Sequence, residues 1–343
     1  QEGELHRQST SGSTGEPFVV LQDQGKRQRT RADTIVFNEM AGLRPFDRLM
    51  WLFAARLLPM SRLVQFARNT IAVDHVGLDD RMCAAIVDRL GRDHVVAMLG
   101  ITSTYQVLAR HLESRATDPP ALGLKVIIAA GENLVAAERD RIAAAFGCPV
   151  VNRYSTQEHG ILAMTEPGGD RLRLNRSSYR FEFLRLDSDR PQEPGQLARV
   201  VITDLYNGAT PMIRFDTGDL TRVDEVDEHG EARSLASIEG RRADVIFDTS
   251  GGQVASPSIS AILVESFPQL QRYQLLQEGP LDYRLLIVQG PERYREADIA
   301  AELRRWLGQD AAIEVRAVTD IAPLASGKHR PVVGHYDPTD GSA

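Results

Sequence analysis

The 343-residue sequence predicts an α/β protein with two domains. We expect a large N-terminal α/β domain that combines a parallel sheet with an antiparallel or barrel-like section, and a small mobile C-terminal α+β domain. Three observations support this. Strand-like apolar runs alternate with helical patterns up to Asn152, short alternating strands separated by Pro and Gly follow Arg171, and a compact mixture of helices and strands follows residue 240. The predicted domains are therefore residues 1–240 and 241–343.

The N-terminal part supplies the parallel layer. After a strand-like run at Phe18–Leu21, the region Arg29–Leu63 is predicted to be helical, with Pro45 and Pro59 as breaks. Strands and helices then alternate: the predicted strands are Val95–Leu99, Lys125–Ala130 and Pro149–Asn152. One predicted helix follows a cap at Thr102 or Ser103, and another spans Val135–Phe146. Because a helix between two strands returns the chain to the same end of the sheet, this alternation indicates parallel strands.

The sequence pattern changes after Arg171, from alternating helices and strands to short strands. Short strands at Arg180–Leu186 and Gln196–Leu205 indicate the antiparallel section. The second domain is predicted to contain helices at Ser258–Phe267 and Glu296–Leu307, and strands at Gln271–Leu276, Tyr283–Val288 and Ile313–Val318.

Composition excludes several classes of protein. Hydrophobic residues make up 42% and charged residues 25%, values that are typical of a globular protein and argue against disorder or a coiled coil. The 47 acidic residues outnumber the 40 basic ones, so the chain lacks the basic surface that nucleic-acid binding requires. The two distant cysteines, Cys83 and Cys148, provide neither a disulfide framework nor a cysteine zinc site and favour the cytoplasm. No apolar stretch is long enough to span a membrane, so no membrane partner is expected.

A hydroxyl-rich loop at residues 9–17 is the first candidate for function. Its glycines let the backbone approach an anion, and its N–H and O–H groups can donate to phosphate oxygens. It is not a Walker A loop, because Gly15 is followed by Glu16 and Pro17 instead of Lys and Ser or Thr. Alone, such a segment is more typical of a flexible Ser/Gly linker.

A basic run follows this loop and consists of Lys26, Arg27, Arg29 and Arg31. Such a run can contact phosphate groups, but a solvated turn is the commoner structure for it. We therefore predict a turn there and assign it no function.

Four further motifs occur in a fixed order. They are Tyr154-Ser155-Thr156-Gln157-Glu158, the segment Arg214–Leu220 with its Thr-Gly-Asp, Gly240–Asp244, and Pro323–Arg330. Together with the hydroxyl-rich loop, the set resembles the adenylate-forming superfamily, which includes acyl-CoA synthetases and peptide-synthetase adenylation domains. Pro211–Phe215 and Gly252–Ser258 resemble more narrowly the phenylacetate-CoA ligase branch and its CapK-like relatives. The resemblance extends from Ser9 to Arg330.

This resemblance implies an ATP site. The residues that would hold the β- and γ-phosphates are Thr10, Ser11, Gly12, Ser13, Thr14 and Gly15. Tyr154, in one motif with Ser155 and Gln157, would lie against adenine, beside the turn formed by Gly131 and Glu132. Asp219 would accept both ribose hydroxyls, and Arg241 would reach the ribose or a phosphate from the hinge between the domains.

Two residues are implied in catalysis. Glu158 would bind Mg²⁺, and Lys328 would stabilise the transition state of adenylation. The chemistry needs both types of group, because a carboxylate that attacks the α-phosphate of ATP brings two anions together. Taken singly, Asp219, Arg241 and Lys328 are more typical of a turn cap, a surface ion pair and a solvated tail. Only their joint occurrence favours the site.

The predicted function is ATP- and Mg²⁺-dependent activation of a carboxylic acid, aryl or arylacetic, to an acyl-adenylate with release of pyrophosphate, followed by transfer to coenzyme A. The alternatives are transfer to an amine or a carrier-protein thiol, and a non-catalytic nucleotide-binding homologue. The protein would be a cytoplasmic monomer or homodimer. Parallel sheets bind ligands at the ends of their strands, so the predicted acid pocket comprises Thr102, Ser103, Tyr105, Asn133 and His159. For His159, a general base and a structural histidine are both open.

Three departures from the family pattern have consequences. Ser155 and Gln157 stand where Gly and Thr are usual, so the Gln157 amide would have to replace a contact to the α-phosphate. Ala243 replaces the usual hinge Asp, which makes thioester formation less certain than adenylation and keeps the amine and carrier acceptors open. Family members usually have a helical segment before the phosphate loop, whereas here the loop starts at Ser9, so we expect the N-terminal domain to lack its usual leading segment.

Overall fold

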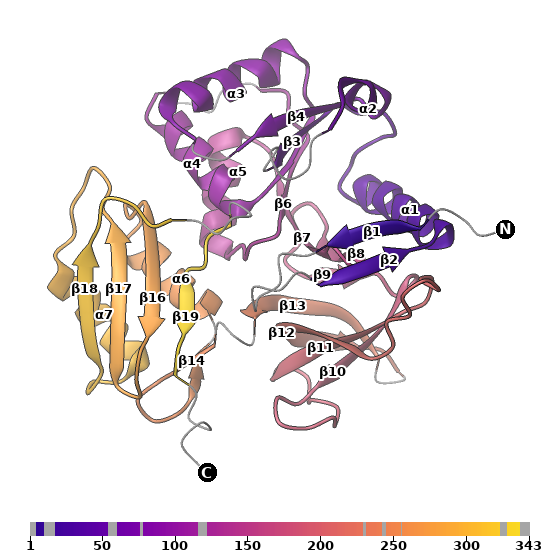
Figure 1. The fold of residues 1–343 in the computed structure, drawn as a ribbon. Coiled ribbons are helices and arrows are strands. Elements are labelled where there is room, and N and C mark those ends of the chain that lie inside the picture. The colour runs from indigo at the N-terminus through magenta and orange to yellow at the C-terminus, as the bar shows by residue number, and fades with distance from the viewer. Residues whose placement is uncertain are drawn as a thin grey trace. The chain divides into compact units, whose positions relative to one another are not determined.

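The computed structural model describes residues 5–9, 18–53, 60–75, 78–115, 122–228, 231–241, 245–254, 256–322 and 328–336. The chain folds into two compact units, which are described separately (Figure 1). The first comprises Gln1–Glu132 and Arg139–Ile238, and the second comprises Asn133–Glu138 and Glu239–Ala343.

The first unit is built on an 11-stranded sheet of order β10-β11-β12-β13-β9-β8-β7-β6-β5-β3-β4 (Figure 1). The parallel half consists of β3 (Leu49–Phe53), β4 (Thr70–Asp74), β5 (Ala97–Gly100), β6 (Val126–Ala130) and β7 (Val150–Thr156). The antiparallel half consists of β8 (Gly160–Thr165), β9 (Leu172–Leu174), β10 (Tyr179–Leu184), β11 (Leu197–Asp204), β12 (Phe215–Val226) and β13 (Ala232–Arg241). The predicted α/β class, with a parallel and an antiparallel section, is confirmed.

A hairpin and five helices accompany this sheet within the described residues. The hairpin pairs β1 (His6–Ser9) with β2 (Val19–Gln22). The helices are α1 (Gln24–Met40), α2 (Arg62–Ala67), α3 (Asp80–Arg92), α4 (Thr102–Glu113) and α5 (Ala136–Phe146). α1 begins after its N-cap Asp23, whose side chain accepts a hydrogen bond from the Lys26 backbone N–H. The cap satisfies one of the N–H groups that a helix leaves without an internal partner at its start.

The core of the first unit fixes α1 against the parallel strands. Phe37 of α1 packs in one cluster with Val126 and Ile128 of β6 and Val151 of β7. All five residues of β6 are buried, which explains why its sequence is continuously apolar instead of alternating. The backbone that precedes the candidate site is therefore held by packing on both faces of the sheet.

The second unit is a small α+β domain, as predicted. Its sheet has the order β18-β17-β16-β19, with β16 (Arg272–Gln277), β17 (Asp282–Val288), β18 (Ala312–Ala317) and β19 (Val332–Gly334). The hairpin β14 (Ile246–Phe247) and β15 (Gln253–Val254) and the helices α6 (Ser256–Ser266) and α7 (Glu296–Leu307) complete it. Leu263 of α6, Leu303 of α7 and Leu285 of β17 meet in its core. Among the helices in the described ranges of the chain, none combines the length and apolar character needed to cross a membrane.

The prediction of a helical region at Arg29–Leu63 is partly wrong. Leu49–Phe53 forms strand β3, and β4 follows where no strand was expected. The sequence of β3 is the continuous apolar run Leu-Met-Trp-Leu-Phe. Periodicity cannot distinguish such a run in a buried strand from a buried helical segment, and here the pairing with β4 and β5 decides the structure.

The predicted solvated turn at the basic run is also wrong, because these residues lie in the first two turns of α1. Lys26 is completely buried, and its Nζ lies 2.7 Å from Oδ2 of Asp204, whose side chain is equally buried. Arg29 pairs with Asp33 one turn further along the helix. Lys and Arg are good helix formers, and only a partner far away in the sequence decides whether such a residue is buried.

Candidate functional site

The sheet changes from parallel to antiparallel at β7, and the predicted nucleotide motif lies at this point. β7 pairs in parallel with β6 and antiparallel with β8. The pair Tyr154 and Ser155 lies at a register shift of β7, and a turn at residues 157–159 leads into β8. In this turn Gln157 is exposed, Glu158 is half-buried and His159 is buried.

Tyr154 and Asp219 are 65 residues apart in the sequence and meet in the structure. The Tyr154 hydroxyl donates to Oδ2 of Asp219 at 2.6 Å. Asp219 lies on β12 directly after Gly218, which has a φ of +74°, a conformation that glycine adopts without strain. The Asp219 N–H donates to Oγ1 of Thr217 at 3.1 Å. The fold thus joins the residues predicted for adenine and for ribose.

A second contact links the predicted turn beside adenine to the predicted acid pocket. The Glu132 carboxylate accepts from the backbone N–H of Ser103 at 2.7 Å and from the Ser103 hydroxyl at 3.1 Å. Ser103 lies in the first turn of α4, where a carboxylate satisfies N–H groups that lack a partner inside the helix. Gly131, between β6 and Glu132, has a φ of +79° and lets the chain turn toward α4.

The remaining predicted pocket residues differ in their surroundings. Thr102 is 2% exposed and Tyr105 is fully buried. The Tyr105 hydroxyl donates to the backbone carbonyl of Ile128 at 3.3 Å, so in this conformation it binds the sheet rather than lining an open pocket. Asn133 belongs to the second unit.

The phosphate-loop residues Thr10 to Gly15 and the hinge residue Ala243 lie outside the described residues. The two strands that flank the loop are paired, with Ser9 of β1 opposite Val19 of β2. Arg241 is exposed at the end of β13, and Lys328 is half-buried shortly before β19. Both belong to the second unit, whereas Tyr154, Glu158 and Asp219 belong to the first.

Buried side chains hold the turn that carries Glu158, and sequence reasoning missed them. Gln22 of β2 donates through Nε2 to the Glu158 carbonyl at 3.0 Å, and the Tyr179 hydroxyl donates to the His159 carbonyl. Lys26 in turn donates to the Tyr179 hydroxyl at 2.8 Å. Each partner comes from a different part of the chain, so no local sequence pattern could have revealed this support.

His159 is neutral at pH 7. Burial, helped by the positive charge of Lys26, lowers the pKa of its imidazole to about 4, and Asp204 opposes this shift. Its Nδ1 lies 3.1 Å from Oγ1 of Thr156, and its Nε2 is buried without a hydrogen-bond partner in the described part of the chain. A neutral imidazole can accept a proton, although its enclosure against Tyr179 and Phe215 favours a structural role.

The pKa of His159 predicts acid sensitivity of the first unit. Because the folded pKa of about 4 lies below the ordinary value of 6.5, the unfolded chain binds the proton first as the pH falls. The stability that His159 contributes is complete above pH 6.5 and is lost toward pH 4, by about 2 kcal/mol between pH 7 and pH 5. His159→Gln should reduce this loss.

Urea unfolding at pH 7 and pH 5 measures the difference. Of the two tryptophans, Trp51 lies in the first unit and Trp306 in the second. A Trp306→Phe background therefore lets Trp51 fluorescence report the first unit alone. Equal losses with and without His159 would contradict the prediction.

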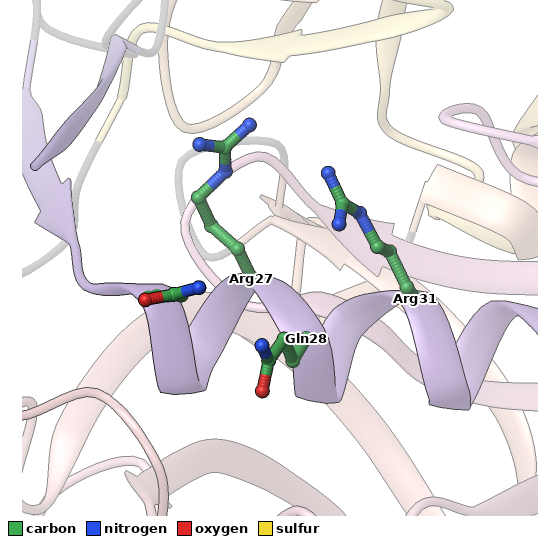
Figure 2. A pocket seen from close by; sticks show the side chains of 4 residues that line it. Arg27, Gln28 and Arg31 are labelled. Atoms are coloured by element: carbon green, nitrogen blue, oxygen red, sulfur yellow. The ribbon is translucent and has the colours of Figure 1, made fainter. Parts of the chain in front are cut away.

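A separate cavity of about 320 Å³ lies beside α1. It is lined by Gln24, Arg27, Gln28 and Arg31. Figure 2 shows the guanidinium groups of Arg27 and Arg31 extending from the same side of the helix, as the spacing of four residues requires. None of the described residues that line it belongs to the predicted acid pocket.

The fold matches that of a solved CoA ligase. A solved structure of 2-hydroxyisobutyryl-CoA ligase, in the postadenylation state in complex with R3-HIB-AMP, matches with a TM-score of 0.75 at 20% sequence identity. The match covers 98% of this chain and 74% of that chain. No family model matches the sequence.

Two curated relatives narrow the resemblance. Phenylacetate-coenzyme A ligase of Thermus thermophilus is 25% identical over 301 residues, which are 83% of this chain and 66% of that protein. Protein CapK of Staphylococcus aureus is 22% identical over 272 residues, which are 77% of this chain and 59% of that protein. The chain thus spans less than two thirds of the length of either relative. The predicted resemblance to the phenylacetate-CoA ligase branch of the adenylate-forming superfamily is confirmed.

Proposed function

We propose that the protein is an ATP-dependent ligase that converts a carboxylic acid to an acyl-adenylate and transfers the acyl group to coenzyme A. The observation that supports this most directly is the hydrogen bond between Tyr154 and Asp219, which unites two of the family motifs at the end of β7. The similarity to a phenylacetate-coenzyme A ligase supports the acceptor, and it favours an aryl or arylacetic acid.

The first half-reaction joins two anions. A carboxylate oxygen attacks the α-phosphorus of ATP, the bond to the β-phosphate oxygen breaks, and pyrophosphate leaves. In this proposal the loop of Thr10 to Gly15 holds the leaving phosphates, Asp219 holds the ribose, and Arg241 adds positive charge. Lys328 provides a cation for the charge that develops on the transferred group.

Glu158 is the proposed ligand of Mg²⁺. The ion, when bound, would offset the negative charge of the phosphates. Mg²⁺ is usually held by one or two carboxylates together with substrate phosphates, and a half-buried Glu158 in a turn with fixed carbonyls fits that need. Within the described residues, no group of three or more His, Cys, Asp or Glu side chains could hold a metal ion without such help.

The proposed acid pocket comprises Thr102, Ser103, Tyr105, Asn133 and His159. We also propose that the protein is located in the cytoplasm, because Cys83 and Cys148 are both free and buried, and thiols stay reduced in that compartment. A monomer or a homodimer is compatible with this reaction.

Asp219→Ala should weaken ATP binding about 10- to 100-fold, because hydrogen bonds to a charged group contribute about 1.5–3 kcal/mol. Isothermal titration calorimetry with ATP would measure it. Asp224→Ala is the matched control, since this carboxylate lies on the same strand but forms an ion pair with Arg171 at the surface. An unchanged ATP affinity in the Asp219 variant would remove the ribose role.

The decisive experiment measures pyrophosphate release by the purified protein with ATP and Mg²⁺. Aryl, arylacetic and aliphatic acids are supplied one at a time, each with and without coenzyme A. Acid-dependent release with an acyl-CoA product supports the proposal and identifies the substrate class. ATP binding without release for any acid would instead support a non-catalytic homologue.

A second candidate function is transfer of the activated acyl group to an amine or a carrier-protein thiol. Ala243 in place of the hinge aspartate favours it, because that position controls the change between half-reactions in the family. Acid-dependent pyrophosphate release without an acyl-CoA product would select this candidate.

A further inference from the structure

We propose that the acid activated by this protein carries a second anionic group and that Arg153 binds it. This inference rests on the proposed ligase function and names the substrate class of its acid pocket. Its observations concern a half-buried arginine whose Nε is enclosed and whose guanidinium has no counterion among the described residues.

Arg153 lies on β7 between Asn152 and Tyr154. In the sheet it is paired with Ala130, the last residue of β6, and with Met164 of β8. Because side chains alternate along a strand, Arg153 points to the face opposite Tyr154, the same face as Val151. Ala130, Met164 and Val151 are all buried apolar residues, so the neighbouring strand positions offer Arg153 no polar partner.

Within the described residues, no counterion accompanies this cation. Arg153 Nε is inaccessible to solvent and has no hydrogen-bond partner, and across the described ranges the side chain forms no ion pair. Arg199, in contrast, has two carboxylate partners, since its guanidinium lies 2.6 Å from Asp216 and 2.9 Å from Asp189. Arg153 as a residue retains some accessible surface, which gives a ligand a direction of approach.

The charge on Arg153 persists at neutral pH. Burial lowers the pKa of its guanidinium to about 10, and Tyr105 opposes the shift. Since this value is still well above 7, the side chain cannot avoid its unfavourable environment by losing the proton. A partly buried charge without a partner destabilises a folded protein, and such positions are concentrated at functional sites.

The chemistry of adenylation indicates which group Arg153 binds. The reacting carboxylate loses its negative charge when it becomes the acyl-adenylate, so it cannot remain the partner of a permanent cation. The nucleotide contacts proposed for Tyr154 lie on the other face of β7. A second carboxylate or another anion on the acyl part would keep its charge throughout, and a guanidinium can bind it with two parallel hydrogen bonds.

The first test compares acids that differ by one carboxylate: benzoate with isophthalate, and phenylacetate with 4-carboxyphenylacetate. We expect the wild type to prefer the dianionic member of a pair in kcat/KM for pyrophosphate release. Arg153→Met should lower that value about 100-fold for the dianionic acid, mainly through KM, and leave the monoanionic acid nearly unchanged. Arg180→Met, an exposed arginine on strand β10, is the matched control and should alter neither value.

The second test distinguishes a binding role from a structural one. Arg153→Met removes a half-buried charge that has no partner among the described residues, so its melting temperature should equal or exceed that of the wild type, whereas loss of a structural arginine would lower it. A lowered melting temperature with an unchanged ratio between the paired acids would overturn the inference. So would a wild-type preference for the monoanionic acids, although the ligase function would then stand.

Direct binding keeps this inference separate from the ligase function. Calorimetric titration of isophthalate into the wild type and into Arg153→Met does not require turnover. Binding that Arg153→Met abolishes supports the inference even if no acid releases pyrophosphate, a result that would count against the ligase alone. Equal binding to both proteins would overturn it.

Discussion

Lys26→Met is expected to lower the free energy of unfolding of the first unit by about 3–5 kcal/mol. The substitution leaves the Asp204 carboxylate buried without its cation, 2.7 Å from where the Lys26 ammonium was. It also removes the donor to the Tyr179 hydroxyl and the contact of the ammonium with the Tyr179 ring. Urea unfolding followed by Trp51 fluorescence in the Trp306→Phe background measures the change.

Two further variants test whether burial of the ion pair causes the loss of stability. Lys26→Met combined with Asp204→Leu removes both charges and should recover most of the lost stability, because apolar pairs of similar volume replace buried ion pairs well. Lys125→Met breaks an exposed pair with Asp47 of similar length, 2.6 Å, and should cost at most about 1 kcal/mol. If Lys26→Met costs no more than Lys125→Met, the buried pair does not stabilise the unit.

Lys328→Ala is expected to slow adenylation about 100- to 1000-fold, the usual effect of removing one preorganised group that stabilises transition-state charge. Use of a preformed acyl-adenylate with coenzyme A should change far less. The two rates are measured as acid-dependent pyrophosphate release and as thioester formation from synthetic acyl-adenylate. Arg316→Ala removes an exposed cation of the same unit and serves as the control. An equal loss in both half-reactions would show that Lys328 is not specific to the first.

The sequence allowed the parallel layer and the small second domain to be predicted, because both depend on local patterns. Val126–Ala130 is continuously apolar, and α7 has the predicted bounds Glu296–Leu307. Strand β3 was missed since its five apolar residues suit a strand or a helix equally well. In that case sheet pairing, which no local window contains, determines the structure.

In the candidate site, only residues that belong to the ordered sequence motifs could be proposed from the sequence. The contact between Tyr154 and Asp219 brings two of the motifs together, and the adenine and ribose roles of these residues stay predictions. In contrast, Lys26 belonged to an apparently ordinary basic run, and Arg153 directly precedes a recognised motif without being part of it. Each residue is distinguished by its environment. Lys26 lies beside a buried carboxylate, whereas Arg153 has no carboxylate partner among the described residues. Such environments are set by residues distant in the chain.

The pair between Lys26 and Asp204 also has a consequence for biosynthesis. The two residues are separated by 178 positions (204 − 26), and translation at about 5–20 residues per second needs roughly 10–35 s to cover them. During that time α1 leaves the ribosome with its Lys26 ammonium still hydrated, because the Asp204 carboxylate has not yet been synthesised. The pair therefore cannot yet hold α1 against the sheet. Docking of α1 through this pair is therefore delayed until β11 has left the ribosome.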